Sequence, residues 1–319
     1  MSGPRPRPRA WGRAPDMAVT VGTVMLANPV MTAAGTAGHG AELARHLDLS
    51  ALGAVVVKSL SAEPWAGNPA PRVHPTDGGM LNSVGLQNPG VPAWLAEELP
   101  ALAATGATVV ASLWGHSVEG YGRAASLLAS AGPSVVAVEV NLSCPNLGRG
   151  HRMFAHDPAA AAEVVEAVTA CGRPLWAKLS PNTADLVAVA GAVLEAGAAA
   201  LTLVNTVAGM AVDPVARRPV LGAGAGGLSG PAVRPVAVRA VYECRRAFPA
   251  APIVGVGGVS TGEHAAELMV AGANAVQVGT ATFVDPRSPA RVRDELARWC
   301  QAQRVLRVAD LIGSAHGNA

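Results

Sequence analysis

Aromatic and charged residues are scarce in this sequence. Phe, Trp and Tyr make up 3% of the 319 residues and Asp, Glu, Lys and Arg make up 14%, whereas half of the residues are hydrophobic. A core of this composition is built mainly from Ala, Val and Leu, which suits close packing of many repeated strands and helices. The net charge is only +2, and four arginines fall within the first thirteen residues. The remaining chain lacks the basic face of a nucleic-acid-binding protein.

Cysteines are also few, since Cys144, Cys171, Cys244 and Cys300 are far apart and form no CxxC pair. Their spacing matches neither a metal or iron–sulfur site nor a disulfide framework, so we expect a reducing, cytoplasmic setting. The sequence has no GxxxxGK[ST] motif, and Gly255–Val259 lacks the spacing of a dinucleotide fingerprint. No apolar run reaches the ~18–20 residues of a membrane span, so no membrane partner is expected.

Short apolar runs alternate with helical patterns along the chain. The runs lie near residues 25, 55, 110, 138, 177, 202, 254 and 277, and all but the first two precede a clear helical pattern. Continuous apolar runs are typical of parallel strands buried on both faces. Eight such units favour an α/β fold of the closed (β/α)8 TIM barrel type over an open sheet. We expect one barrel domain at residues 17–319 and a disordered Pro- and Arg-rich tail at residues 1–16.

Two long segments are predicted to be loops. Residues 61–92 are polar and rich in Pro and Gly, and residues 221–230 are rich in Gly. Loops of such length inside a compact domain are uncommon and are usually functional.

Polar side chains gather directly after the expected strands. The strongest cluster follows Val135–Val138 and consists of Asn141, Ser143, Cys144 and Asn146. An Asx-rich turn that caps the next helix is the structural alternative, but four such side chains together favour a functional site. Because the carboxyl ends of barrel strands converge on one face, we expect these clusters to form the active site there.

Glycine turns follow the last two expected strands, at Gly257-Gly258 and Gly279-Thr280. In barrels, backbone N–H groups at these positions hold phosphate, and Gly226-Gly227 supplies further N–H groups. A tight turn explains any one pair, whereas two pairs after the final two strands indicate a phosphate ligand.

Lys58 and Lys178 stand at strand ends inside apolar stretches. A lysine is seldom buried without a partner, although its ammonium can also reach solvent. A buried cation stabilises negative charge that develops on a ligand, for example at N1 and C2=O of a flavin ring on reduction.

Four asparagines, Asn82, Asn141, Asn146 and Asn205, combine donors and acceptors that suit a planar ligand such as a pyrimidine. Cys144 is then the candidate general base, and its thiol, with an ordinary pKa of ~8.5, needs activation near neutral pH. A small buried residue is the commoner role of a lone cysteine.

Ten stretches resemble the class 1 dihydroorotate dehydrogenases, and most of all the class 1B catalytic subunit. They occur in the family's order across residues 19–285. The stretches are Asn28–Thr36, Val57–Ser61, Glu63–Arg72, Gly79–Gly90, Val140–Asn146 (VNLSCPN), Ala177–Asn182, Leu201–Asp213, Gly226–Pro231 (GGLSGP), Ile253–Gly258 and Ala275–Thr280. Cys144 stands in the base position, where class 2 enzymes have serine. The resemblance implies a barrel with bound FMN that oxidises dihydroorotate to orotate in pyrimidine synthesis.

The resemblance also implies roles for single residues. Cys144 would take the C5 proton of dihydroorotate while the C6 hydride passes to FMN N5. The implied substrate-binding residues are Lys58, Asn82, Ser83, Val84, Gly85, Leu86, Asn141, Asn146, Asn205 and Thr206. The implied FMN-binding residues are Ala34, Lys58, Ser59, Ser112, Asn141, Lys178, Val204, Gly227, Gly257, Gly258, Gly279 and Thr280.

Several positions depart from the family pattern. Ala34 and Ser112 replace the usual serine and asparagine, which predicts the loss of about 1 kcal/mol of FMN binding for each lost hydrogen bond. Residues 147–152 replace a usual Val-Lys-x-Gly-Gly run and add two arginines near the site. Trp65 and Trp114 are bulky additions to which the sequence gives no role.

The resemblance implies a homodimer, or a heterotetramer with an electron-transfer subunit that carries FAD and a 2Fe–2S cluster and reduces NAD⁺. Two alternatives stay open at this stage. One is a related flavin oxidoreductase that acts on another pyrimidine-like ring. The other is a phosphate-binding barrel without redox chemistry.

Overall fold

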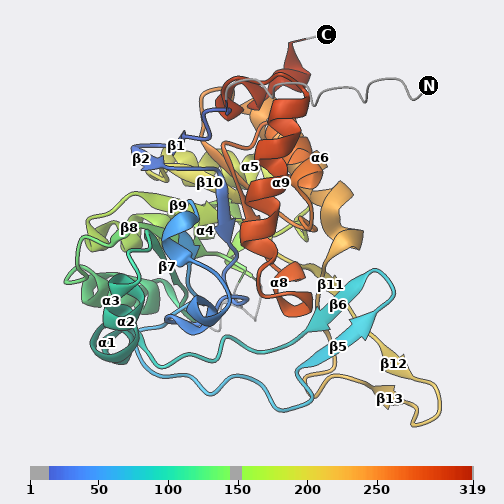
Figure 1. The fold of residues 1–319 in the computed structure, drawn as a ribbon. Coiled ribbons are helices and arrows are strands. Elements are labelled where there is room, and N and C mark those ends of the chain that lie inside the picture. The colour runs from blue at the N-terminus through green and yellow to red at the C-terminus, as the bar shows by residue number, and fades with distance from the viewer. Residues whose placement is uncertain (1–13, 144–152, 318–319) are drawn as a thin grey trace, which may run out of the picture.

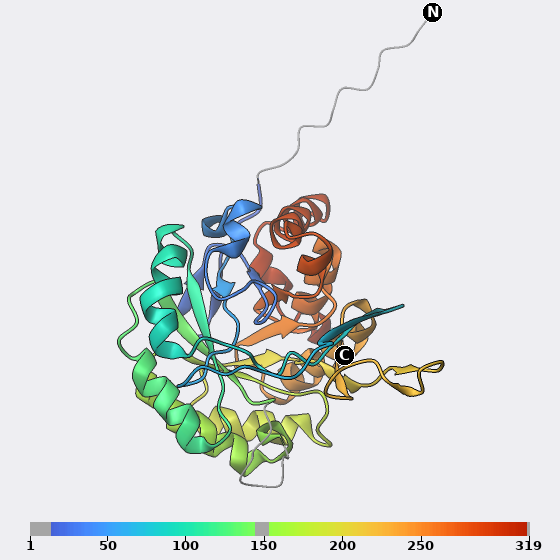
Figure 2. The same cartoon turned by 90° about the horizontal axis from the view of Figure 1, so that it is seen from below.

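The computed structural model describes residues 14–143 and 153–317, and its centre is an eight-stranded parallel sheet. The strands in chain order are β3 (Val30–Thr32), β4 (Val55–Val56), β7 (Val109–Leu113), β8 (Val135–Asn141), β9 (Leu175–Lys178), β10 (Ala200–Leu203), β15 (Ile253–Val256) and β16 (Ala275–Val278). The first and last strands of the sheet order, β3 and β4, are joined by a bridge between Met31 and Ala54. The sheet is therefore closed, which confirms the (β/α)8 barrel (Figures 1 and 2).

Helices surround this barrel (Figure 2). They are α1 (Val91–Ala93), which continues through a π-helical turn at Trp94–Glu98 into α2 (Leu99–Ala104), α3 (Val118–Leu128), α4 (Pro158–Val168), α5 (Leu186–Glu195), α6 (Arg234–Ala247), α7 (Gly262–Ala271), α8 (Ala281–Val284) and α9 (Ser288–Ala302). Four of them begin at a side chain that accepts a hydrogen bond from a first-turn N–H group, which fixes where the helix starts. These caps are Ser117, Asp157, Asp185 and Thr261.

The barrel core is aliphatic, as the composition predicts. Nearly every residue of the eight strands is buried, and only a few large aromatic side chains are fully enclosed, among them Trp94, Trp176 and Phe154. Small side chains between strands and helices allow close packing, and this rigid body holds the strand ends in place.

The first barrel strand is β3, so the prediction of a barrel strand near residue 25 is wrong. Residues Val24–Leu26 form β2, which pairs antiparallel with β1 (Val19–Val21). Val24 and Leu26 are buried whereas Met25 is 77% exposed, so this hairpin has one solvent face. The carbonyl of Thr20 accepts a hydrogen bond from Asn274, just before β16. The hairpin therefore lies against the amino ends of the strands, opposite the expected active site.

The two predicted loops contain strands, which corrects the sequence prediction. β5 (Val73–Thr76), β6 (Gly79–Asn82), β11 (Val207–Gly209) and β14 (Gly226–Ser229) form an antiparallel sheet in the order β11-β14-β6-β5, here called the rim sheet. A separate small hairpin is formed by β12 (Val212–Asp213) and β13 (Arg218–Pro219), and both it and the rim sheet project from one side of the barrel (Figure 1). A Cβ atom at Gly79 would lie 1.9 Å from the Ser229 carbonyl oxygen, so glycine permits this close pairing.

The start of the chain is paired earlier than predicted. Residues 1–13 of the expected 1–16 tail lie outside the described residues, but Asp16 bridges to Arg307. The N–H of Asp16 donates to the Leu306 carbonyl at 2.8 Å, and the N–H of Val308 donates to the Asp16 carbonyl at 2.8 Å. No helix within the described residues combines the length and apolar character needed to cross a bilayer.

Candidate active site

A cavity of about 740 Å³ lies where the carboxyl ends of the barrel strands meet the rim sheet. This size is within the range of pockets that bind small molecules and cofactors. Seventeen of the residues predicted for the site line it: Ala34, Lys58, Ser59, Asn82, Ser83, Val84, Gly85, Leu86, Asn141, Lys178, Val204, Asn205, Thr206, Gly257, Gly258, Gly279 and Thr280. The strand-end clusters, which are scattered along the sequence, thus form one site.

Four predicted residues do not line this cavity or cannot be placed. Ser112 is fully buried behind Ser59, with the two Oγ atoms 2.8 Å apart. Gly227 pairs with Asn82 in the rim sheet, and a Cβ atom there would lie 2.0 Å from the Thr206 hydroxyl. Ser112 and Gly227 therefore support residues that line the cavity, Ser59 and Thr206, without lining it themselves. Cys144 and Asn146 lie outside the described residues.

One wall is a chain of hydrogen-bonded amides. Asn205 Nδ2 donates to Asn141 Oδ1 at 3.1 Å, and Asn141 Nδ2 donates to Ser59 Oγ at 3.2 Å. The N–H of Ser143 also donates to Asn141 Oδ1, and the N–H of Thr206 donates to Asn205 Oδ1. Because every member is held by a neighbour, the carboxamides are fixed before a ligand arrives.

The Lys58 side chain lies half-buried beside this wall. Its own burial lowers the pKa of the Lys58 ammonium, and the charge of Arg72 lowers it further. Burial lowers the pKa of His39 to about 4, with the charge of Lys58 as the second cause and the charge of Glu42 opposing both. The Lys58 ammonium, with the charge of Arg72 near it, suits an anionic ligand.

The opposite end of the cavity is built from glycines and hydroxyls. The φ angles of Gly257 and Gly258 are +139° and +70°, in a region that favours glycine. Cβ atoms at these positions would lie 2.7 Å from Ala237 Cβ and 2.6 Å from Arg234 Cβ of α6. Side chains at this turn are therefore excluded, and the backbone faces the cavity.

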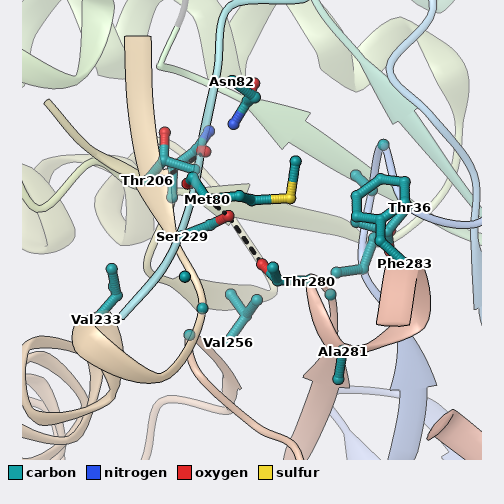
Figure 3. Close-up of a pocket in the computed structure, with 18 of the residues that line it drawn as sticks. Thr36, Met80, Asn82, Thr206, Ser229, Val233, Val256, Thr280, Ala281 and Phe283 are labelled. Carbon is teal, nitrogen blue, oxygen red and sulfur yellow. Dashed lines mark hydrogen bonds between the residues drawn. The ribbon is translucent and has the colours of Figure 1, made fainter. Parts of the chain in front are cut away.

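Hydroxyl groups complete this end. Thr280 Oγ1 donates to Ser229 Oγ at 2.8 Å, which joins the end of β16 to the end of β14 (Figure 3). Backbone N–H groups next to hydroxyls are the donors that a phosphate ester needs. Ser229 was missed from the sequence because it was assigned to a loop, although it lies in the Leu-Ser-Gly-Pro run.

Apolar side chains narrow the cavity between these two ends. Met80 projects from β6 toward Thr36 and Phe283, and Val256 and Val233 lie toward the glycine end (Figure 3). An apolar middle between two polar ends fits the body of a planar ring better than it fits a small free anion.

The segment 83–88 is held from outside by residues 65–72. Trp65 Nε1 donates to the Gly85 carbonyl at 3.0 Å, and the N–H of Asn68 donates to the Val84 carbonyl at 3.1 Å. Leu86 has a φ of +61°, which is unfavourable for a branched side chain and persists only where neighbours impose it. This segment is therefore held in place by its neighbours.

Trp65 and Trp114 belong to one aromatic cluster with His116. The ring centroids of His116 lie 4.7 Å from Trp65 and 4.6 Å from Trp114, both edge to face. Burial lowers the pKa of His116. The two added tryptophans thus join the end of β7 to the segment 83–88.

Beneath the cavity, Lys178 contacts a buried carboxylate. Lys178 Nζ lies 3.1 Å from Glu139 Oε1, and Gln277 Nε2 donates to Glu139 Oε2 at 2.6 Å. Sequence reasoning missed Glu139 and Gln277 because each stands singly inside an apolar run. Among the described residues, no cluster of three His, Cys, Asp or Glu side chains is placed to hold a metal ion.

The comparisons with known proteins agree with this geometry. The sequence matches the family model described as dihydroorotate dehydrogenase over residues 16–299. The chain belongs to the dihydroorotate dehydrogenase family. It is 47% identical over 301 residues to the catalytic subunit of dihydroorotate dehydrogenase B (NAD(+)) from Geobacter sp. strain M21, which covers 94% of this chain and 98% of the relative. It has the same identity and coverage with a putative dihydroorotate dehydrogenase A (fumarate) from Solibacter usitatus strain Ellin6076.

Membership of the dihydroorotate dehydrogenase family confirms the resemblance drawn from the sequence motifs, including that to the class 1B catalytic subunit. Enzymes of this family are flavin-dependent oxidoreductases that act on dihydroorotate in pyrimidine biosynthesis. The cavity fits a flavin that carries a phosphate: the glycine turns and hydroxyls at one end suit the phosphate, and the apolar middle suits a ring.

Proposed function

We propose that this dihydroorotate dehydrogenase binds FMN and converts (S)-dihydroorotate to orotate, with Cys144 as the base. One observation carries the proposal: a single cavity joins a glycine-and-hydroxyl end at β15 and β16 to an amide wall at β8 and β10. The first suits the phosphate of FMN, and the second suits the carbonyl and N–H edges of a pyrimidine.

The cofactor is held by the barrel. The backbone at Gly257, Gly258 and Gly279, with the Ser229 and Thr280 hydroxyls, receives the phosphate. Ser59 and Lys178 lie at the strand ends where the ring fits, and Lys178 supplies the positive charge there. When bound, FMN supplies a hydride acceptor for C6 of the substrate.

The substrate is held between the amide wall and the rim sheet. Asn141 and Asn205 present fixed carboxamides, and Asn82 presents a third from the end of β6. The half-buried Lys58 ammonium suits the substrate carboxylate. The amides therefore align the ring, and the lysine sets its direction.

The proton is removed by Cys144, which follows Asn141 and Ser143 in the sequence. Loss of the C5 proton to this thiolate and of a hydride from C6 leaves the C5=C6 double bond of orotate. Because the thiolate is the active form, flavin reduction by dihydroorotate should become faster as pH rises toward the thiol pKa.

Electrons then leave through a partner or an external acceptor. We propose a heterotetramer with a subunit that carries FAD and a 2Fe–2S cluster and reduces NAD⁺, built on a homodimer of this chain. The support is the name of the Geobacter relative, a catalytic subunit of an NAD(+) enzyme. The Solibacter relative is named for fumarate. Reoxidation of the reduced protein by fumarate alone would favour the second acceptor.

We also propose a cytoplasmic setting. Cys171, Cys244 and Cys300 are buried free thiols, and burial raises the pKa of Cys244 to about 12 and that of Cys300 to about 11. Such thiols are inert and compatible with a reducing compartment.

The decisive test is identification of cofactor and product. The purified protein, reconstituted with FMN if needed, is mixed with dihydroorotate, and orotate is measured against added acceptor. Orotate formation by wild type but not by Cys144→Ala near neutral pH supports the proposal. A yellow protein that forms no orotate favours a related flavin enzyme for another pyrimidine-like ring. A protein that cannot bind FMN contradicts the proposal.

A further inference from the structure

A carboxylate is enclosed inside the barrel, directly below the cavity. The side chain of Glu139 on β8 has no exposed surface, and that of Lys178 on β9 is 6% exposed. Glu139 Oε1 lies 3.1 Å from Lys178 Nζ, and Glu139 Oε2 accepts from Gln277 Nε2 of β16 at 2.6 Å. Three strands thus contribute one polar group each to a buried network.

The strand register separates the two charges along the barrel axis. Lys178 pairs with Asn141 and lines the cavity, whereas Glu139 pairs with Trp176 and does not. Lys178 therefore stands two residues nearer the carboxyl ends of the strands than Glu139. The ammonium belongs to the cavity floor, and the carboxylate holds it from the core side.

This buried network also orients the side-chain amide of Gln277. Gln277 Oε1 has no hydrogen-bond partner among the described residues, so Glu139 alone orients the amide. A buried ion pair contributes little to stability compared with apolar side chains of the same size, and it needs another reason to be present. The cavity above Lys178 supplies that reason.

We propose that Glu139 is a positioning residue that holds the Lys178 ammonium at the cavity floor, and thereby sets the reduction potential of the bound flavin. The proposal rests on the proposed function, because it requires a flavin in the cavity. A reduced flavin ring carries added negative charge, which a fixed cation stabilises. Without the carboxylate, the buried ammonium has no ionic partner in the core and moves toward water. Positive charge then leaves the floor, and the flavin becomes harder to reduce.

The test is a redox titration of FMN-loaded Glu139→Gln without substrate. We expect the flavin reduction equilibrium to shift at least tenfold toward the oxidised form, which is about 30 mV for a two-electron couple. Sulfite, an anion that adds to oxidised flavins, should bind at least tenfold more weakly, because its adduct also places negative charge on the ring. Glu195→Gln removes the same charge from the exposed end of α5 and should leave both values unchanged.

A second set of variants separates positioning from stability. Lys178→Met should lower the potential at least as much, and adding Glu139→Gln to it should cause no further shift, because Glu139 acts through Lys178. If Glu139→Gln does not fold, Glu139→Asp carries the test. It keeps the charge, but its shorter side chain cannot reach Lys178 at 3.1 Å, so the potential should again fall.

An unchanged or raised potential in the variant that folds would overturn the inference, whatever its thermal stability. A drop that is additive in the double variant would overturn it too. Failure of the proposed function is a separate result, since it appears as wild-type protein that binds no FMN or ignores dihydroorotate.

Discussion

The barrel and the rim sheet build two halves of the site in different ways. Barrel strands are buried on both faces and hold charged groups through buried partners, as Lys178 is held by Glu139. The rim sheet is half-exposed and glycine-rich, and it presents Asn82 from β6, in strands whose hydrogen bonds are mainly backbone. The rigid half suits a cofactor that stays bound, and the rim suits a substrate that enters and leaves.

The largest effect is expected at Cys144, the proposed base. Cys144→Ala should slow flavin reduction by dihydroorotate at least a hundredfold near neutral pH, because the C5 proton has no acceptor. Cys144→Ser should be intermediate and gain rate as pH rises. Anaerobic rapid mixing measures both, and a wild-type rate in Cys144→Ala would remove the base from the account.

A substitution in the glycine turn should impair cofactor binding and leave the rim sheet unchanged. Gly258→Ala should weaken FMN binding and destabilise the fold by about 1–3 kcal/mol from backbone strain, with a similar cost from crowding against Arg234. Gly172→Ala is the matched control. The φ of Gly172 is +66°, but a Cβ atom added there would have no neighbouring atom within 4 Å. Equal losses of stability and FMN affinity in the two variants would contradict the packing argument.

A substitution in the rim sheet should impair substrate binding and leave FMN binding unchanged. Asn82→Ala should raise KM for dihydroorotate roughly tenfold to a hundredfold, because a buried ligand group loses its partner. FMN affinity, measured by fluorescence quenching, should stay at the wild-type value. A parallel loss of FMN would show that the two halves are not separable.

A smaller effect is expected at Trp65, which contacts the segment 83–88 from outside. Trp65→Phe keeps the aromatic contacts but loses the hydrogen bond to the Gly85 carbonyl, which should raise KM by roughly two- to tenfold. Trp299→Phe on α9 makes the same chemical change away from the cavity. If both variants behave like wild type, Trp65 does not position the segment 83–88.

The smallest effect concerns acid stability. The unfolded chain protonates His39 below about pH 6.5, whereas the folded protein does so only near pH 4. The unfolded state therefore binds more protons in this window, and stability falls as pH drops through it. His39→Gln should flatten this part of a plot of urea midpoint against pH. The exposed His46→Gln is the control, and an unchanged slope in His39→Gln would contradict the assignment.

These two halves also differ in how far the sequence predicted them. The barrel was predicted because its buried strands are apolar runs in the sequence. The run Val24–Leu26 has the same character, so it was assigned as the first barrel strand in place of β3. The rim sheet was missed because its strands are short, and Gly227 pairs with Asn82 across a long sequence separation. Single polar residues inside apolar runs, such as Glu139 and Gln277, carry no periodic signal. Their function depends on which strands become neighbours.

The central claim is that one cavity brings a flavin and dihydroorotate together. Anaerobic titration of the FMN-loaded wild-type protein with dihydroorotate, followed by its visible spectrum, tests this most directly. We expect the flavin absorbance to bleach as dihydroorotate is added, with one orotate formed for each flavin reduced. A flavin that stays oxidised in excess dihydroorotate would contradict it.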